Sequence, residues 1–269
     1  MKATPVLNYP VMMSIAGSDC SSGAGIQADM KAAAAMDVFA LTAVTCVVSE
    51  IPGQVSRIQE VDPDIVSDQV RLLLESFPVG AVKTGMLYSS DIIRSAAALL
   101  KGRGIPLVVD PVMIATSGDS LMREEALKIL TGKLLPLAAL VTPNLDEAAV
   151  FLGWMPATLS EVREAAYQLA SRFGTAFLVK GGHLPGSQDR LDVLVTPSGE
   201  MEEWRSPFIE GVSTHGTGCT YSSAIAAGLA KGLPLREAVE RAHGYVARAI
   251  GHSFRWNGSS CMEALNHFV

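Results

Sequence analysis

Cysteine is scarce in this sequence, and its spacing excludes two classes of small protein. Four cysteines occur in 269 residues, at Cys20, Cys46, Cys219 and Cys261. Small secreted scaffolds need paired cysteines for disulfides, and structural zinc sites need closely spaced ones. Neither arrangement is present here. We therefore expect a cytoplasmic protein whose thiols are reduced.

Clusters of basic residues and long apolar runs are also lacking. The net charge is −6 at neutral pH, whereas a nucleic-acid-binding protein usually carries a basic patch. No apolar run reaches the length that spans a bilayer. Pro5, Asn8 and Pro10 interrupt the apolar core that a signal peptide would need. We expect neither a nucleic acid nor a membrane as a partner.

Short apolar segments that alternate with helical ones are abundant. Strands that are apolar throughout are typical of a parallel sheet buried on both faces, and their alternation with helices indicates an α/β fold. The pattern contains no linker, repeat or composition break, which predicts one domain over residues 1–269. Residues 55–61 are expected to form a short strand outside the main sheet, in a lid or a dimer surface. The other expected strands span 11–16, 39–48, 79–83, 105–109, 138–141, 176–180, 191–196 and 202–207, and the expected helices span 26–36, 63–76, 89–101, 123–131, 159–173, 220–231 and 235–252.

The functional prediction depends most on residues 213–220, which read Ser-Thr-His-Gly-Thr-Gly-Cys-Thr and precede an Ala-rich helix. The two glycines let the backbone turn tightly and bring its N–H groups close to a ligand. Ser213 or Thr214 is available to cap the helix. A helix N-terminus suits a phosphate and would lower the pKa of the Cys219 thiol, which makes that thiol a candidate base. The alternatives are a tight loop ahead of a closely packed helix and a small buried cysteine.

Charged and amide side chains follow three of the expected strands. Asp110 stands before a proline at a strand end, where it can bind a metal or a magnesium–phosphate unit. Lys180 ends another strand and can pair with nucleotide phosphates. Asn144 and Glu147 lie three positions apart at a helix start, so they share one face and can hold hydrated Mg²⁺. The alternative for this pair is a capping box, and both interpretations can hold together.

A glycine-rich turn over residues 17–29 follows the first strand, at the edge where open α/β sheets bind ligands. Its glycines are wrongly spaced for the dinucleotide-binding fingerprint. An ordinary strand-to-helix connection remains the alternative. Glu50 ends the second strand and is either a solvated loop residue or a ligand contact.

Taken together, these segments resemble the hydroxymethylpyrimidine/phosphomethylpyrimidine kinase family within the ribokinase-like kinases. The matching segments appear in family order over nearly the whole chain. They are Ala-Gly-Ser-Asp at 16–19 with Gly-Ala-Gly-Ile-Gln-Ala-Asp at 23–29, Lys-Thr-Gly-Met at 83–86, Asp-Pro-Val-Met at 110–113, Thr-Pro-Asn at 142–144 with Glu147, Val-Lys-Gly-Gly-His at 179–183, and Gly-Thr-Gly-Cys-Thr at 216–220. The resemblance implies a three-layer αβα sandwich with a mainly parallel sheet and small peripheral strands.

The resemblance also implies a reaction and a set of site residues. ATP would phosphorylate 4-amino-5-hydroxymethyl-2-methylpyrimidine and then its monophosphate, for thiamine synthesis, with Mg²⁺ as cofactor. The implied pyrimidine pocket is Gly17, Asp19, Ala24, Val48, Glu50, Met86 and Val112, in which Glu50 accepts a hydrogen bond from the exocyclic amine. The implied catalytic set is Cys219, Gly216, Thr217, Gly218 and Lys180, the ATP site is Lys180, Thr142, Asn144, Gly181, Gly216 and Gly218, and the metal site is Asp110, Asn144 and Glu147. Relatives are commonly dimeric, so a homodimer is expected.

Two other functions remain open. A pyridoxal or pyridoxine kinase of the same fold would also phosphorylate the hydroxymethyl arm of a flat heteroaromatic ring. A non-catalytic vitamin-binding protein would bind such a ligand without forming ADP. The chain also departs from the family pattern, because Cys20 and Ser22 replace the usual proline and glycine. Thr116 stands where a lysine is usual, which bears on the second phosphorylation.

Overall fold

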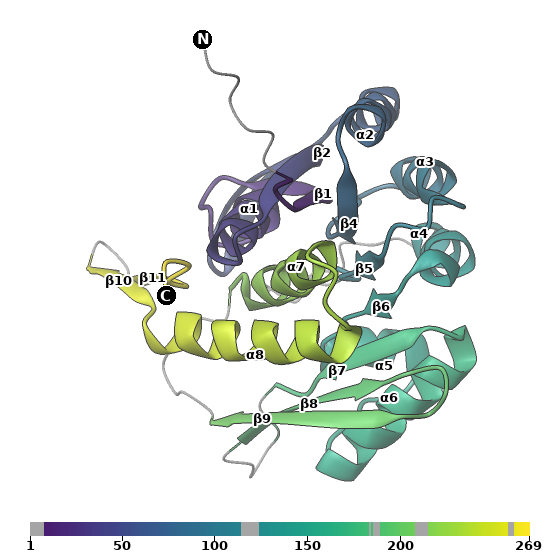
Figure 1. The fold of residues 1–269 in the computed structure, drawn as a ribbon. Coiled ribbons are helices and arrows are strands. Elements are labelled where there is room, and N and C mark those ends of the chain that lie inside the picture. The colour runs from purple at the N-terminus through teal and green to yellow at the C-terminus, as the bar shows by residue number, and fades with distance from the viewer. Residues whose placement is uncertain (1–7, 114–123, 183, 185–188, 208–214, 258–260) are drawn as a thin grey trace.

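The computed structural model describes residues 8–113, 124–182, 184, 189–207, 215–257 and 261–269. One nine-stranded sheet runs through them in the order β3-β2-β1-β4-β5-β6-β7-β8-β9 (Figure 1). Strands β2, β1, β4, β5, β6 and β7 run parallel, and β3, β8 and β9 are antiparallel to their neighbours. The bounds are β1 (Val11–Asp19), β2 (Phe39–Ile51), β3 (Gln54–Glu60), β4 (Val79–Thr84), β5 (Leu107–Val109), β6 (Leu140–Val141), β7 (Ala176–Lys180), β8 (Asp189–Val195) and β9 (Met201–Pro207).

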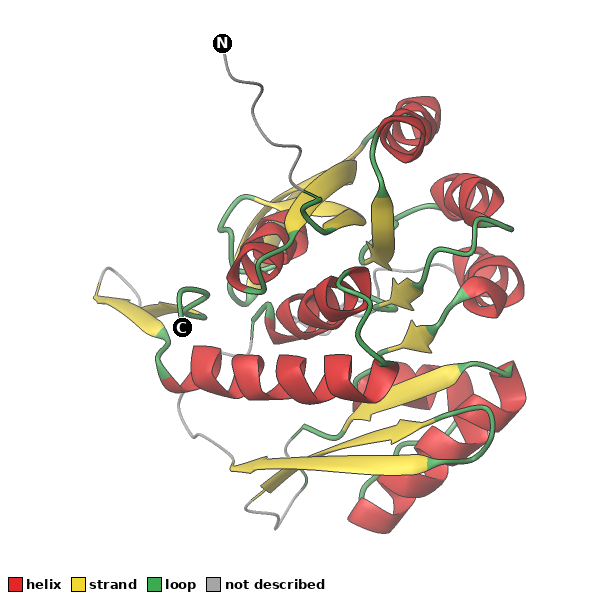
Figure 2. Ribbon diagram, in the orientation of Figure 1, coloured by secondary structure: helices red, strands yellow, loops and turns green. Residues whose placement is uncertain are grey.

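Helices cover both faces of this sheet (Figures 1 and 2). Helices α1 (Gly25–Ala35), α7 (Thr217–Ala230) and α8 (Leu235–Gly251) pack on one face. Helices α2 (Pro63–Ser76), α3 (Ser90–Leu100), α4 (Glu124–Ile129), α5 (Leu145–Leu152) and α6 (Leu159–Phe173) pack on the other. The predicted α/β sandwich with a mainly parallel sheet is therefore confirmed. The single-domain organisation stays a prediction.

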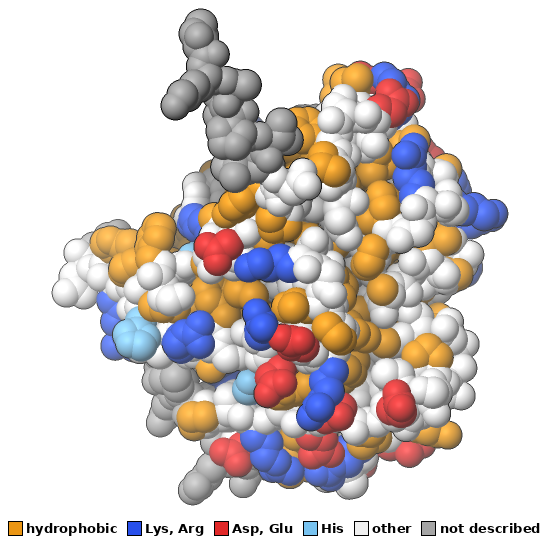
Figure 3. All heavy atoms as spheres, in the orientation of Figure 1, with side chains coloured by type: hydrophobic (Ala, Val, Ile, Leu, Met, Phe, Trp, Pro, Cys, Tyr) orange, Lys and Arg blue, Asp and Glu red, His pale blue; other side chains and the backbone are white. Residues whose placement is uncertain are grey.

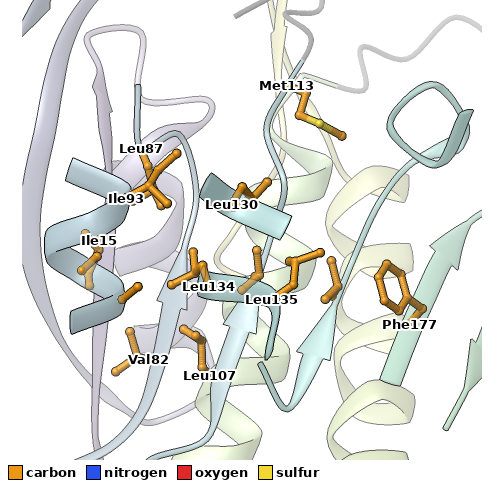
Figure 4. Close-up of a cluster of buried hydrophobic side chains, with 14 of the residues drawn as sticks. Ile15, Val82, Leu87, Ile93, Leu107, Met113, Leu130, Leu134, Leu135 and Phe177 are labelled. Atoms are coloured by element: carbon orange, nitrogen blue, oxygen red, sulfur yellow. The ribbon is translucent and has the colours of Figure 1, made fainter. Parts of the chain in front are cut away.

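The first strand shows why the central strands of the sheet are mostly apolar. Met13 and Ile15 of β1 pack into one apolar cluster and Met12 into the other, and all three are fully buried. Successive side chains of a strand point to opposite faces, so a strand between two helical layers has no polar face. Figure 4 shows Ile15, Val82 and Leu107 from the neighbouring strands β1, β4 and β5 in one of these clusters.

Two segments differ from the prediction. Strand β3, expected outside the main sheet, pairs antiparallel with β2 and forms one edge of that sheet. The C-terminal segment, for which we predicted no element, contains a small antiparallel pair of β10 (Phe254–Asn257) and β11 (Cys261–Ala264). Both pairings depend on contacts between strands, which single-strand patterning does not encode.

The surface carries mixed charge on the face that Figure 3 shows. Acidic and basic side chains alternate there over α8 and β9, in agreement with the ion pairs Arg236–Glu202 and Arg241–Glu237. Within the described ranges, no helix combines the length and the apolar character that crossing a membrane requires.

The turn ahead of α7 lies against the turn ahead of α1. Helix α7 begins at Thr217, and its N-cap is Gly216, which provides no side-chain cap. Gly216 has φ of +80°, and a Cβ there would lie 1.7 Å from the carbonyl oxygen of Gly23. Only glycine permits this approach. The expected hydroxyl cap is therefore wrong for the N-cap position, and Ser213 and Thr214 lie outside the described residues.

We predict that Gly216→Ala lowers the free energy of unfolding by at least about 2 kcal/mol, because it adds a left-handed backbone penalty to a steric overlap. Gly132→Ala is the matched control, since a Cβ at Gly132 meets nothing within 4 Å. The control should leave stability unchanged or slightly raised. Urea unfolding of both variants measures the difference. Wild-type stability in Gly216→Ala would contradict the close approach of the two turns.

Candidate active site

A cleft of about 430 Å³ opens at the carboxyl ends of the parallel strands. The turn after β1 and the start of α7 form its walls, together with the ends of β2, β4 and β5. Its lining includes every predicted pyrimidine-pocket residue, Gly17, Asp19, Ala24, Val48, Glu50, Met86 and Val112, and also Asp110, Asn144, Glu147, Lys180, Gly216, Gly218 and Cys219. The structure thus brings into one cleft residues from nearly the whole length of the chain, from Gly17 to Cys219.

Three predicted site residues do not border the cleft: Thr142, Gly181 and Thr217. Thr142 donates a hydrogen bond from its hydroxyl to Asp110 Oδ1 at 3.2 Å, so it orients a residue that does line the cleft. The N–H of Gly181 donates to the carbonyl of Leu191 at 2.8 Å. That N–H is used between two strands and is not free for a phosphate.

Lys180 and Asp110 form the charged centre of the cleft. Lys180 Nζ lies 3.1 Å from Asp110 Oδ1, and the hydroxyl of Ser222 donates to Asp110 Oδ2 at 3.1 Å. Burial disfavours the charge on Asp110, but Lys180 and Lys83 outweigh it and hold the pKa of Asp110 below its usual value. A Cβ on Gly218 would lie 3.1 Å from Lys180 Nζ. The start of α7 therefore lies directly against this ion pair.

Asn144 and Glu147 form the capping box of α5, as predicted. Asn144 Oδ1 accepts from the N–H of Glu147 at 2.8 Å, and Glu147 Oε2 accepts from the N–H of Asn144 at 2.9 Å. Burial raises the pKa of Glu147 to about 7, because Lys180 only partly offsets the loss of solvent and Asp110 adds to the effect. One oxygen of each side chain therefore already accepts a backbone N–H, although both residues line the cleft.

Asp19 also lines the cleft, where it joins the turn ahead of α1 to the turn ahead of α7. Its carboxylate accepts from the N–H groups of Ser21 and Ala24, both at 2.7 Å, and lies 3.1 Å from His215 Nε2. Burial works against ionisation, yet these contacts lower the pKa of Asp19 to about 2. Glu50 lies close by, and burial followed by the charge of Asp19 raises its pKa above the usual range. A fixed carboxylate and a second, more easily protonated carboxyl thus face each other.

Asp19, Glu50 and His215 each offer a ligand atom within 4.8 Å of the others, which is compatible with a metal ion. The Asp19 oxygens already accept several hydrogen bonds, however, and one of these contacts is to His215. We therefore interpret the group as a hydrogen-bonded clamp between the turns. His215 was not predicted as a site residue. In the sequence it stands between Thr214 and Gly216, and nothing beyond its position in the segment 213–220 indicated a role.

Cys219 lines the cleft in the first turn of α7, as predicted, but its titration differs from the prediction. Burial raises the pKa of the thiol to about 12, and Lys83 and the N–H of Gly25 oppose this shift without cancelling it. The predicted lowering of the pKa by the helix start is therefore wrong for the ligand-free protein. Loss of solvent around a thiolate outweighs the field of one helix N-terminus.

A buried ion pair lies beneath this thiol and was also missed. Lys83 of β4 and Asp29 of α1 are both fully buried, with Nζ–Oδ distances of 2.8 and 2.9 Å. Ser14 and Ser223 donate to the same carboxylate at 2.5 and 2.7 Å. Lys83 also borders the cleft. The available signal was a lysine inside an otherwise apolar strand, which needs a buried partner.

Comparisons with known proteins agree with this site. The profile of the phosphomethylpyrimidine kinase family matches residues 19–262. A hydroxymethylpyrimidine/phosphomethylpyrimidine kinase of Streptomyces coelicolor is 40% identical, over 95% of this chain and 94% of that protein. A thiamine biosynthetic bifunctional enzyme of Arabidopsis thaliana is 41% identical, over 92% of this chain and 48% of that longer protein. A solved pyridoxal kinase of Bacillus subtilis, in complex with ADP, has a TM-score of 0.88 and 34% identity over 97% of this chain and 98% of that one.

The family profile and the curated relatives match the chain almost from end to end, and the residues that carry the resemblance meet in one cleft. On these grounds the chain belongs to the phosphomethylpyrimidine kinase family, whose fold is that of the ribokinase-like kinases.

Proposed function

We propose that this kinase transfers the γ-phosphoryl group of ATP to 4-amino-5-hydroxymethyl-2-methylpyrimidine and then to the resulting monophosphate, in thiamine biosynthesis. The observation that carries the proposal is the position of Cys219. Cys219, Gly216 and Gly218 border the same cleft as Asp19 and Glu50 and as Lys180 and Asp110. A ring against the first pair and phosphates against the second would place the reacting groups beside the thiol.

The chemistry follows from this arrangement. The substrate hydroxyl oxygen attacks the γ-phosphorus, and its proton passes to the thiolate of Cys219. The bond between the γ-phosphorus and the bridging oxygen breaks, and its electrons leave with ADP. The amides of Gly216, Thr217 and Gly218 are the candidate donors to the migrating phosphoryl oxygens. Lys180 is the candidate cation for the ATP phosphates. Thr142 and Gly181 do not border the cleft, so they belong to the proposed ATP site only indirectly: Thr142 orients Asp110, and Gly181 follows Lys180 in the chain.

Mg²⁺ fits the oxygen atoms at the Lys180 end. Asn144 and Glu147 accept each other's backbone N–H groups, and Asp110 accepts from three side chains. An ion would therefore reach these oxygens mainly through water, which Mg²⁺ readily retains. Burial, with Asp110 nearby, raises the pKa of Glu147 to about 7, and a divalent cation would relieve this repulsion. Bound with ATP, Mg²⁺ supplies neutralisation of phosphate charge.

Glu50 is the proposed recognition group for the aminopyrimidine. An amino group next to a ring nitrogen offers one donor and one acceptor, and a protonated carboxyl offers the complementary pair. Burial and the charge of Asp19 raise the pKa of Glu50, so the neutral acid persists to a higher pH than usual. The B. subtilis neighbour named as a pyridoxal kinase keeps pyridoxal as the second candidate substrate.

Three further features belong to the same proposal. Location in the cytoplasm and a homodimer are proposed from the sequence, with β3 as a candidate contact. A vitamin-binding protein without turnover remains the non-enzymatic alternative, and ADP release excludes it. The Thr116 substitution bears on the second step, and this residue lies outside the described ranges.

The first prediction concerns substrate choice. With Mg²⁺ and ATP, ADP release should be faster with the pyrimidine alcohol than with pyridoxal, because only the pyrimidine matches the donor and acceptor pair of Glu50. Comparison of kcat/KM for both alcohols and for the pyrimidine monophosphate measures this preference. About ten-fold preference for pyridoxal would overturn the proposed substrate. Absence of turnover with the monophosphate would remove the second step only.

The second prediction concerns the base. Cys219→Ala should lower kcat about 10²- to 10⁴-fold while the affinity for ATP stays the same, because the thiol acts on the hydroxyl proton and not on the nucleotide. Cys20→Ser is the control for loss of a thiol, since Cys20 is exposed and does not border the cleft, and a serine hydroxyl can keep its hydrogen bonds to the backbone of Glu50. Steady-state kinetics and nucleotide binding measure both quantities. Near wild-type kcat in Cys219→Ala would remove the base role.

The third prediction concerns pH. In the wild type, KM for the pyrimidine alcohol should rise as the pH rises through the elevated pKa of Glu50, because the carboxyl loses its donor. Glu50→Gln keeps a donor and an acceptor at every pH, so its KM should be flat over the same range. Glu50→Ala controls for loss of the contact and should raise KM throughout. A KM for Glu50→Gln that follows the wild-type pH profile would contradict this recognition.

A further inference from the structure

The buried Asp29–Lys83 pair is built from four separate elements. Asp29 comes from α1, Lys83 from β4, and the two serine donors from β1 and α7. Each oxygen of Asp29 accepts one bond from Lys83 and one from a serine hydroxyl. The carboxylate therefore accepts four hydrogen bonds, which is its full capacity. Burial opposes the charge on Lys83, but Asp29 outweighs it and raises the pKa of the ammonium.

Such a pair is costly for a protein to bury. Removing two charges from water costs several kcal/mol each in practice, and apolar residues of similar volume often stabilise a core equally well. Lys83 and Asp29 both have 0% exposed side chains. Stability alone is therefore a weak explanation for a charged pair at this position. Because Lys83 borders the cleft, a functional role is the better explanation.

The geometry of two helices puts the pair next to Cys219. Ser223 lies one turn after Cys219 in α7, so both side chains share a face, and Ser223 donates to Asp29 at 2.7 Å. In α1, Gly25 lies one turn before Asp29, and the N–H of Gly25 faces the Cys219 thiol. The thiol is thus located one helical turn from the ion pair along both helices. Lys83 and Cys219 also line the same cleft.

The charges that face the thiol come from several elements. Lys83 of β4 and the N–H of Gly25 of α1 favour the thiolate, while Asp29 and Asp110 oppose it. Lys180 of β7 interacts with the thiol more weakly than with Asp110 and Glu147. Burial has the largest effect and raises the thiol pKa to about 12. Among these charges, Lys83 is the main one that favours the thiolate.

We propose that Lys83 is a positioning residue for the base: Asp29, with Ser14 and Ser223, holds its ammonium charged beneath Cys219, and this fixed charge stabilises the thiolate that takes the hydroxyl proton. The inference rests on the proposed base role of Cys219 and extends it. Lys83 itself need not touch the substrate. Its effect is on the proton equilibrium of the thiol, which can be measured without turnover.

The test compares alkylation of Cys219 by iodoacetamide in the wild type and in the double variant Lys83→Met/Asp29→Asn. The double variant removes both charges together, so no unpaired charge remains buried. Mass spectrometry of the peptide that contains Cys219 gives its alkylation rate as a function of pH. The loss of Lys83, which favours the thiolate, outweighs the loss of Asp29, which opposes it. At about pH 9 the double variant should therefore react about three-fold more slowly, as expected for a rise of about half a unit in the thiol pKa. Its pH–rate profile for kcat/KM should shift to higher pH.

Ser223→Ala is the structural control, because it breaks one hydrogen bond of the network and changes no charge. It should alkylate within about two-fold of the wild type. If Ser223→Ala slows alkylation as much as the double variant does, the pair has only a structural role and the proposal fails. Equal alkylation rates in the double variant and the wild type also overturn it. Should the double variant not fold, Lys83→Gln, whose amide can still donate to Asp29, replaces it and should slow alkylation more strongly, because the opposing charge of Asp29 remains.

The alkylation experiment separates this inference from the function proposed above. Slow alkylation in the double variant, together with normal kcat in Cys219→Ala, would support the electrostatic role of Lys83 and reject the base role. Unchanged alkylation with a large loss of kcat in Cys219→Ala would reject the role of Lys83 alone.

Discussion

The orientation of α7 is the constraint on which the rest of the site depends. Three polar residues in its first turns make buried contacts in different directions. Thr220 lies 3.0 Å from His267 Nε2, Ser222 donates to Asp110, and Ser223 donates to Asp29. Buried hydrogen bonds of this kind are costly to leave unmade. Together they fix the rotation of the helix, and that rotation turns Cys219 and the amides before it toward the cleft.

The cleft combines two groups of polar residues with different chemistry around this helix start. In the first group, Lys180 balances Asp110 and Glu147, so further anionic charge can bind there only together with a cation. In the second group, His215 and backbone N–H groups hydrogen-bond to Asp19, and Glu50 is the carboxyl that can change protonation. A phosphate donor suits the first group and a neutral heteroaromatic ring suits the second. This difference in chemistry explains how one cleft can distinguish its two substrates.

The sequence predicted the sheet and most of the site, because both leave local signals. Apolar strands that alternate with helices predicted the two-faced parallel sheet, and the segments that carry the family resemblance predicted most of the cleft lining. The capping box of Asn144 and Glu147 was readable because its two residues are three positions apart. The features that could not be predicted from the sequence depend on residues that are distant along the chain but close in space. His215 acquires its role from Asp19, 196 positions away.

The titration of Cys219 illustrates the same limit. A helix start lowers the pKa of a thiol, and that effect can be read from the sequence, but loss of solvent around Cys219 raises the pKa by more. The compensating charge comes from Lys83, whose partner Asp29 is 54 positions away. The N-cap at Gly216 was missed for a related reason, since only the approach of Gly23 explains why a glycine and not a hydroxyl residue stands there.

The most direct measurement is a crystal structure of the protein with the pyrimidine alcohol and the non-hydrolysable ATP analogue AMP-PCP. Our account predicts that the hydroxymethyl oxygen lies within hydrogen-bonding distance of Cys219 Sγ and in line with the γ-phosphorus, with the ring against Glu50. A ring bound elsewhere, or a hydroxymethyl group turned away from the sulfur, would contradict it.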